Sequence, residues 1–68
     1  MMRIEFNNEI LAVQSVRWYY DSKSIFFESF SGQVYEYVCT CISERNGLIQ
    51  KLRDTGYIRI SGEVKIKV

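Results

Sequence analysis

Alternating apolar and polar residues dominate the first part of the chain. Arg3-Ile4-Glu5-Phe6 alternates and is followed by Asn7-Asn8, which tolerate the positive φ of a two-residue hairpin turn. From Glu9 to Asp21, one apolar face is expected from the even positions Ile10, Ala12, Val16, Trp18 and Tyr20. A strand of this length is unusual, so we predict a bend or bulge near Gln14-Ser15.

Two further strands follow at short intervals. Residues 21–24, Asp-Ser-Lys-Ser, have the composition of a turn, and residues 25–30 then read as a strand. Ser31-Gly32 supplies the glycine that a tight reversal needs, and residues 33–38 alternate again. The pattern therefore predicts a three-stranded antiparallel meander, rich in aromatic residues, over residues 9–38.

The segment after the meander has a different period. Its apolar residues, Ile42, Leu48, Ile49 and Leu52, form a helical stripe that breaks strand alternation. We predict a helix near 43–55, with Ser43 as its N-cap and Gly56 as its C-cap. Asn46-Gly47 is also a strong hairpin signal, so a second hairpin over this segment stays open as an alternative.

The C-terminal tail alternates without interruption. Its apolar residues share one parity, and they are Ile58, Ile60, Val64, Ile66 and Val68. This predicts one half-buried strand, or a hairpin that turns at Gly62-Glu63. The fold expected for residues 1–68 is a single α+β domain: a small twisted antiparallel sheet of four to six strands, meander first, with one helix. An all-β small barrel is the alternative.

Composition argues against several classes of function. The 68 residues contain no His, and nine Lys and Arg residues nearly balance eight Asp and Glu residues. The commonest general base is therefore absent, the carboxylates are scattered, and no glycine-rich phosphate loop is present. Cys39 and Cys41 have a spacing that suits neither a disulfide between them nor a complete zinc site. We expect no enzyme activity, no cofactor and no metal, and treat both cysteines as small apolar residues.

Two features bear on location and partners. No run approaches the roughly 18 apolar residues needed to span a bilayer, and the first residues lack the apolar region of a signal peptide. We therefore expect a cytoplasmic protein that does not enter a membrane. Aromatic residues are abundant, and Tyr and Trp are favoured at protein interfaces. The predicted protein-binding residues are Trp18, Tyr19, Tyr20, Tyr35 and Tyr37.

The basic residues give the competing hypothesis. Residues 51–68 contain five cations against two acidic residues, and the cations are Lys51, Arg53, Arg59, Lys65 and Lys67. Small β-rich domains bind single strands by combining such a basic track with exposed aromatic side chains. The aromatic residues here lie elsewhere in the sequence and alternate with glutamates, so a single-stranded nucleic-acid-binding domain is the less favoured alternative.

The meander also resembles a known family. Ser15, Tyr20-Asp21, Ile25, Phe27 and the stretch Phe30-Ser31-Gly32-Gln33-Val34-Tyr35-Glu36-Tyr37 resemble the KTSC domain of bacterial and phage proteins. The later Leu48, Leu52 and Thr55-Gly56-Tyr57 extend the resemblance to about residues 15–60. Val38-Cys39-Thr40-Cys41 replaces the Val-Pro usual in that family, and the tail after Gly62 has no counterpart. The resemblance implies a compact meander with a helix and no established catalytic activity.

Together these observations favour a small non-catalytic protein-binding module. It would recognise another protein, or a second copy of itself, through an aromatic sheet face or an exposed edge strand. A phage- or mobile-element-encoded inhibitor or accessory protein would fit the small size and the absence of chemistry.

Overall fold

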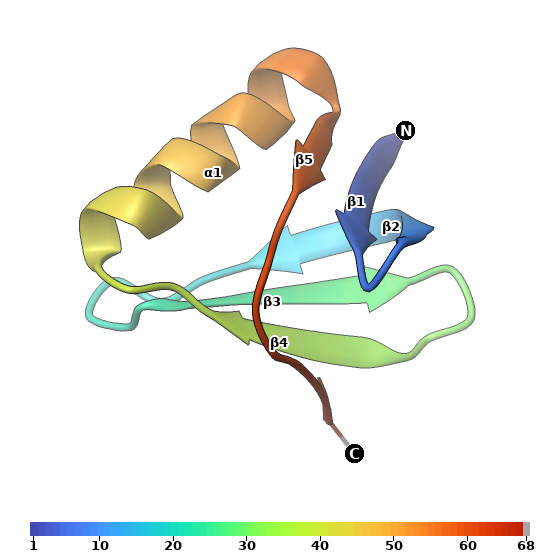
Figure 1. Cartoon of the computed structure of the whole chain (residues 1–68), viewed down its shortest axis with the longest axis horizontal. Helices are drawn as coiled ribbons and strands as arrows, with labels where there is room; N and C mark the ends of the chain where they lie inside the picture. Colours follow the sequence, from blue (N-terminus) through green and yellow to red (C-terminus); the bar gives the residue numbers. More distant parts are fainter. Residues whose placement is uncertain (68) are drawn as a thin grey trace.

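The computed structural model describes residues 1–67, and across them six strands form one mixed sheet beside a single helix (Figure 1). The elements are β1 (Met2–Phe6), β2 (Glu9–Arg17), β3 (Ser24–Ser29), β4 (Val34–Val38), α1 (Ile42–Thr55), β5 (Tyr57–Arg59) and β6 (Val64–Lys67). The strand order is β5-β1-β2-β3-β4-β6. The α+β prediction is confirmed, and because the sheet is not closed, the barrel alternative is wrong.

The hairpins of the meander follow from local sequence. Asn7 and Asn8 have φ values of 51° and 63°, so both central turn residues adopt the left-handed conformation that a tight hairpin between β1 and β2 requires. Gly32 has φ 92° in the turn between β3 and β4. The predicted antiparallel pairing of β2, β3 and β4 is confirmed.

The bulge in β2 changes which side chains are buried. The register passes from Val13 opposite Ser29 to Ser15 opposite Glu28, so Gln14 is the extra residue. One extra residue reverses the parity of the strand, and Val13 and Val16 consequently face the same core. The prediction of one continuous face from Ile10 to Tyr20 is wrong, because Ile10 lies on the opposite side and is 62% exposed.

Helix α1 forms where predicted, and its ends are fixed by two residues. The N-cap is Cys41 and not Ser43, because the Cys41 Sγ accepts a hydrogen bond from the Glu44 backbone N–H at 3.4 Å. The C-cap is Gly56 as predicted, with φ 75° and its N–H bonded to the Leu52 carbonyl. The hairpin alternative is wrong, because α1 is continuous through Asn46-Gly47. Burial of Ile49, about 2 kcal/mol, more than offsets the ~1 kcal/mol that Gly47 costs a helix.

The tail forms two strands on opposite edges of the sheet. β5 pairs in parallel with β1, and β6 pairs antiparallel with β4. The segment between them crosses in front of the sheet (Figure 1), and its Ser61 carbonyl accepts a hydrogen bond of 2.7 Å from the Tyr37 hydroxyl. The hairpin predicted at Gly62-Glu63 is therefore wrong, and the sheet is mixed rather than wholly antiparallel.

The core lies between the sheet, α1 and the crossing segment. Its most deeply buried side chains are Phe27, Ile4, Ile25, Ile58 and Val13. Phe27 stacks on Tyr35 with ring centroids 5.3 Å apart and meets Phe6 edge to face at 5.8 Å. Several of the aromatic side chains therefore pack in or against the core.

Candidate functional site

The five aromatic residues predicted to bind protein do not share one face. Tyr37 is buried, while Trp18 and Tyr35 are half-buried. Tyr19 and Tyr20 are 57% and 94% exposed. Of the predicted set, only these two tyrosines present most of their surface to solvent, and they are consecutive.

Tyr19 and Tyr20 begin the connection between β2 and β3. We call residues 19–22 the aromatic turn. The Tyr19 ring packs edge to face on Phe26, with centroids 5.7 Å apart, and the Ser22 backbone N–H donates to the Tyr19 carbonyl at 3.1 Å. Tyr20 is almost fully exposed and projects outward. The turn therefore presents one tyrosine that packs on Phe26 and one whose side chain lies in solvent.

A buried arginine of α1 holds the backbone of this turn. Arg45 is only 4% exposed, and its Nη1 donates to the carbonyls of Tyr19 at 2.7 Å and Ser22 at 2.5 Å, with a longer contact of 3.4 Å to Tyr20. Its Nε and Nη2 donate to the Asn46 Oδ1. The guanidinium is thus satisfied by neutral oxygen atoms, and three of the four backbone positions of the aromatic turn are tied to the helix.

Sequence reasoning missed Arg45, although a signal was present. Arg45 precedes Ile49 and Leu52 by four and seven residues, so it occupies the same helical stripe as these two buried residues. An arginine at an expected core position indicates a buried cation that needs oxygen partners, because an unpartnered buried charge costs several kcal/mol. The sequence could not show which carbonyls would supply them.

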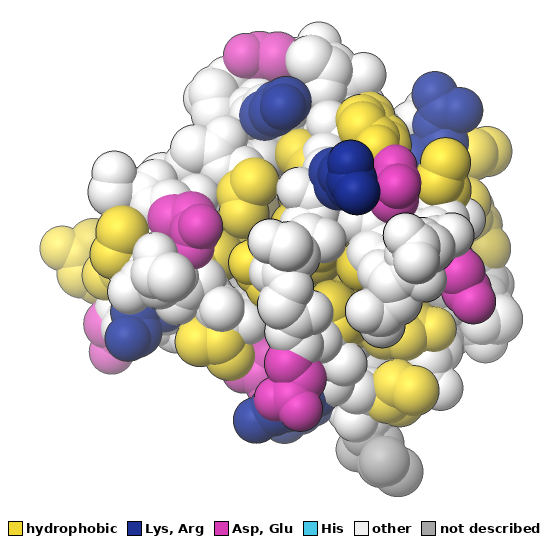
Figure 2. Space-filling view, viewed as in Figure 1, with side chains coloured by type: hydrophobic (Ala, Val, Ile, Leu, Met, Phe, Trp, Pro, Cys, Tyr) yellow, Lys and Arg dark blue, Asp and Glu magenta, His cyan; other side chains and the backbone are white. Residues whose placement is uncertain are grey.

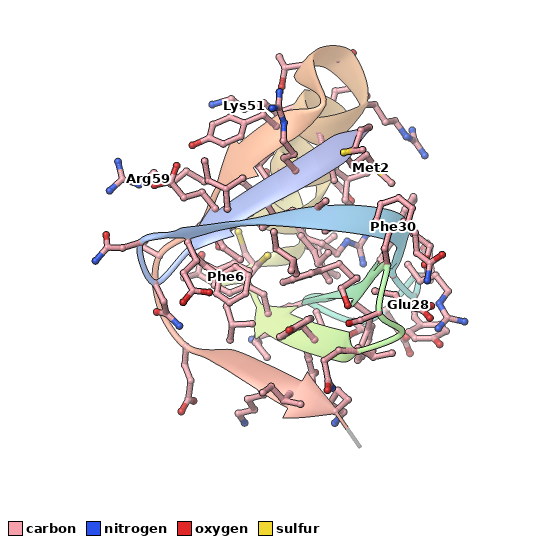
Figure 3. The ribbon with its side chains drawn as sticks, turned by 90° about the vertical axis from the view of Figure 1, so that its right-hand side faces the viewer. Met2, Phe6, Glu28, Phe30, Lys51 and Arg59 are labelled. Atoms are coloured by element: carbon pink, nitrogen blue, oxygen red, sulfur yellow. The ribbon has the colours of Figure 1, made fainter. Side chains whose placement is uncertain are left out.

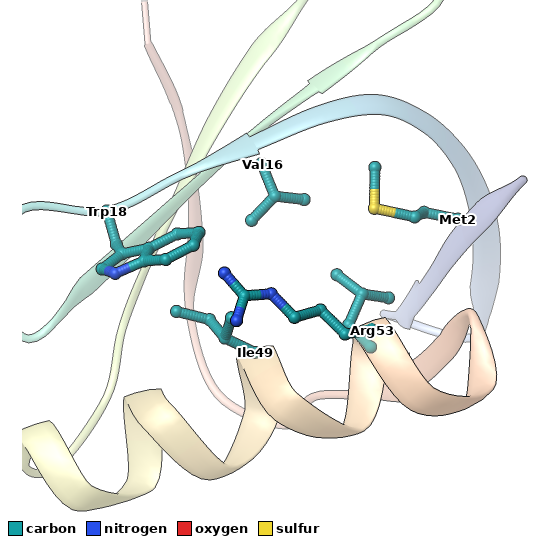
Figure 4. A pocket seen from close by; sticks show the side chains of 6 residues that line it. Met2, Val16, Trp18, Ile49 and Arg53 are labelled. Carbon is teal, nitrogen blue, oxygen red and sulfur yellow. The ribbon is translucent and has the colours of Figure 1, made fainter.

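A groove lies beside the aromatic turn, between α1 and strands β1 and β2 (Figure 4). Its main cavity has a volume of about 250 Å³ and is lined by Met2, Val16, Trp18, Ile49, Leu52 and Arg53. The Arg53 guanidinium carbon lies 5.3 Å from the centroid of the Trp18 ring. We call this the Trp18–Arg53 groove, and it brings a predicted aromatic residue and a predicted basic residue together.

The other predicted basic residues are dispersed. Figure 3 places Lys51 and Arg59 on the side of α1 and β5, away from the lysines of β6. Arg59 lies 3.9 Å from a Glu5 oxygen, and Lys67 lies 3.2 Å from a Glu36 oxygen. Figure 2 likewise shows cations separated by other side chains and interspersed with acidic ones. The five residues therefore do not form a continuous basic track.

The Glu36 carboxylate belongs to a polar network on the outer face of the sheet. The Ser24 hydroxyl donates to it at 2.7 Å, and Lys67 lies on its other side. The Ser24 hydrogen bond and, after it, the Lys67 charge outweigh partial burial and lower the pKa of Glu36 below its usual value. This part of the face is occupied by its own hydrogen bonds and ion pair.

The side chains of the edge strand β6 disfavour pairing with a strand of another molecule. Lys65 pairs opposite Glu36 in the register, and Ile66 is 61% exposed. The Lys67 carbonyl already accepts a hydrogen bond of 3.1 Å from the Gln33 side chain. Lysines along an edge disfavour pairing with another strand, so β6 is a weaker candidate for recognition than the aromatic turn.

The two cysteines have different environments. Cys39 is buried, and burial raises the pKa of its thiol, which is therefore protonated at neutral pH. Cys41 is exposed and caps α1, so the expectation of two similar small apolar residues holds for Cys39 alone.

Comparisons with known proteins do not assign a family. No family model matches the chain, and no match was found among curated proteins or solved structures. The KTSC resemblance accordingly stays an expectation from its motif. Within residues 1–67, no helix has the length and apolar character required to cross a membrane.

Proposed function

We propose that the protein is a non-catalytic protein-binding module that contacts its partner through the aromatic turn. The observation that carries this proposal is the pairing of two exposed tyrosines with a buried Arg45 that fixes their backbone. Burial of a cation is costly, so its use on the carbonyls of this turn supports a role that depends on the defined shape of the turn.

A fixed aromatic turn suits binding for an energetic reason. Association costs roughly 0.5–1.5 kcal/mol for each flexible side chain that becomes ordered. Tyrosine has few rotatable bonds and offers a large apolar ring with one hydroxyl, so it adds contact area at small entropic cost. With the backbone already held by Arg45, most of the backbone ordering at Tyr19 and Tyr20 precedes binding.

The proposed role is that of an inhibitor or accessory protein, including one carried by a phage or mobile element. A chain of 68 residues can cover a patch on a partner but has little room for a deep active site. We favour a protein partner over single-stranded nucleic acid because the predicted cations are dispersed over α1, β5 and β6 and form no continuous track beside the exposed tyrosines.

The test begins with identification of the partner. A photo-crosslinking amino acid at position 20 should capture it from the native host, whereas the same group at position 30 should not. Phe30 is 62% exposed and lies in the turn at the opposite end of β3, which makes it a matched control (Figure 3). The captured protein would then be purified and its affinity measured by calorimetry.

Substitutions in the purified pair decide the outcome. Tyr20→Ser should weaken binding by roughly 30-fold if it is an interface hot spot, and Tyr19→Ser by about 10-fold. Phe30→Ser should leave the affinity within about twofold. Equal affinities for the wild type and both tyrosine variants would refute the proposal, as would a partner that binds only through the Phe30 turn. Sizing chromatography of the same variants shows whether the partner is a second copy.

A further inference from the structure

We propose that the Trp18–Arg53 groove binds an extended segment of the partner protein in which an apolar residue neighbours an Asp or Glu. This inference rests on the proposed protein-binding function and adds the chemistry of the segment that is recognised. It is carried by three observations: an apolar cavity, a cation beside it, and a second cavity that shares this cation and is lined in part by the amides of Asn46 and Gln50.

The apolar cavity has the size of one side chain. Its volume of about 250 Å³ lies below the range of roughly 300–1,000 Å³ typical of sites for drug-sized ligands. Val16 and Leu52 form its walls, and Met2 lies at the end away from Trp18 (Figure 4). Burial of a leucine-sized side chain here would strengthen binding by roughly 10- to 100-fold.

The cation at the mouth is available for an acidic group. Arg53 extends from α1 toward Trp18 (Figure 4), and stacking over the ring holds its guanidinium at the opening. The ion pairs described within residues 1–67 join Arg59 to Glu5 and Lys67 to Glu36 and do not involve Arg53. Arg53 can therefore form a two-point ion pair with an incoming carboxylate without first breaking one.

The second cavity, with two side-chain amides in its lining, shows how the bound segment would continue. It has a volume of about 180 Å³ and is lined by Trp18, Asn46, Ile49, Gln50 and Arg53. The Asn46 Oδ1 is used by Arg45, and the Gln50 Nε2 by Asp54, which leaves an amide donor and an amide acceptor. Such a pair matches one peptide group of an extended chain.

The position of Arg53 favours an acidic side chain over a chain terminus. Arg53 lines both cavities, so the carboxylate that it binds lies between them. A C-terminal carboxylate would end the ligand at the guanidinium and leave the Asn46–Gln50 cavity empty. An internal Asp or Glu lets the chain pass the cation and occupy both sides.

Trp18 provides the assay, because it is the only tryptophan of the chain. The full-length protein would be titrated, with tryptophan emission as the readout, against capped octapeptides with a central Leu-Asp in a glycine–serine background. Matched peptides would carry Leu-Asn or Ala-Asp at the same place, and a free-acid peptide would end in Leu. We expect a saturable emission change, with Leu-Asp binding about 5-fold more tightly than Leu-Asn, which loses the ion pair, and at least about 10-fold more tightly than Ala-Asp, which loses the buried side chain. Tighter binding of the free-acid peptide would overturn the choice of an internal carboxylate.

A pair of variants separates the groove from general charge. Arg53→Gln should abolish the preference for Leu-Asp over Leu-Asn, while Lys51→Gln, which removes an exposed cation of the same helix outside the groove, should preserve it. Circular dichroism and urea unfolding would verify that both variants fold. No emission change with any peptide at millimolar concentration, or an unchanged preference in Arg53→Gln, would overturn the proposal.

The two proposals can fail separately. Tyr20→Ser lies outside the groove lining and should leave the peptide titrations unchanged. Loss of partner binding in Tyr20→Ser together with silent peptide titrations would reject the groove and keep the aromatic turn. If the peptides bind but Tyr20→Ser leaves the affinity for the partner unchanged, the aromatic turn is rejected as the partner-binding surface.

Discussion

Replacement of Arg45 by methionine tests whether a buried cation holds the aromatic turn. Methionine keeps a long flexible side chain at the buried position but removes every hydrogen bond of the guanidinium. The two short bonds, to the Tyr19 and Ser22 carbonyls at 2.7 and 2.5 Å, carry most of the effect, and the 3.4 Å contact to Tyr20 adds little. Asn46 loses its partner but is exposed and can turn to water.

The expected cost follows from opposing contributions. Two charge-assisted hydrogen bonds contribute about 3–5 kcal/mol, and removal of the guanidinium recovers part of its desolvation cost while water reaches the freed carbonyls. We expect Arg45→Met to lower the free energy of unfolding by about 2 kcal/mol, which corresponds to a melting temperature lower by roughly 10 °C in a chain of this size. Lys51→Met, which removes an exposed cation of α1, should change the free energy by less than about 0.5 kcal/mol.

Two measurements check this expectation. Urea unfolding followed by Trp18 emission gives the free energy, and ¹⁵N relaxation gives the order parameter of the Tyr20 amide. That order parameter should fall from about 0.85 toward 0.6 or below when the turn is released, while amides of β3 stay rigid. A variant that loses stability with an unchanged Tyr20 order parameter would show that Arg45 supports the core and does not fix the turn. A loss below about 0.5 kcal/mol would refute the reasoning altogether.

Two other predictions concern glycine conformation and acid stability. Gly47→Ala should stabilise the fold by about 0.5–1 kcal/mol in thermal melts, because Gly47 lies inside α1 with nothing within 4 Å of an added Cβ. Gly56→Ala should destabilise the fold by about 1 kcal/mol, because Gly56 has φ +75°. Equal effects of the two substitutions would contradict the assignment of Gly56 as the C-cap. The pKa of Glu36 is lowered because Ser24 and Lys67 hold its ionised form, so this form stabilises the fold at any pH above the unfolded pKa of about 4.3. The stabilisation is lost as the pH falls through the lower pKa of the folded state. The melting temperature should therefore fall between about pH 5 and pH 3, and less steeply in Glu36→Gln; identical pH profiles would count against the network.

Local signals predicted much of the fold. The Asn7-Asn8 turn, the bulge at Gln14 and the glycine C-cap at Gly56 each depend on the conformations of a few adjacent residues. The helical period of α1 also prevailed over the hairpin signal of Asn46-Gly47, because the stripe of Ile49 and Leu52 extends beyond that dipeptide.

Features that depend on distant pairing could not be predicted in this way. Alternation in the tail is equally compatible with one strand, a hairpin or two separate strands, and the choice depends on which edges of the sheet are open. The bulge lies at Gln14, where it was expected, but both faces of the first half of β2 carry apolar residues, so alternation does not show whether Ile10 or Leu11 faces the core. The N-cap of α1 is Cys41 and not Ser43 because a thiol, as well as a hydroxyl, can accept a hydrogen bond from a free N–H of the first turn.

The candidate site was predicted only in its residue types. Their aromatic side chains single out Trp18, Tyr19 and Tyr20, but these residues lie beyond the end of β2, where strand alternation does not decide which of them is exposed. Tyr37 is predicted on the same ground but is buried, because the segment between β5 and β6 covers it and the Ser61 carbonyl accepts a hydrogen bond from its hydroxyl. Exposure of an aromatic side chain depends on what covers the sheet, and that information is not local.

The end of β2 and helix α1 act together in both proposed surfaces. Trp18 turns inward to the groove and Tyr19 turns outward onto Phe26, so one strand end contributes to both. From α1, Arg45 is buried and fixed by carbonyls, while Arg53 is exposed and rests on Trp18. The first arginine gives the turn a defined shape, and the second gives the neighbouring groove a charge. If this division is correct, loss of Arg45 should disturb binding at both surfaces, whereas loss of Arg53 should affect only the groove.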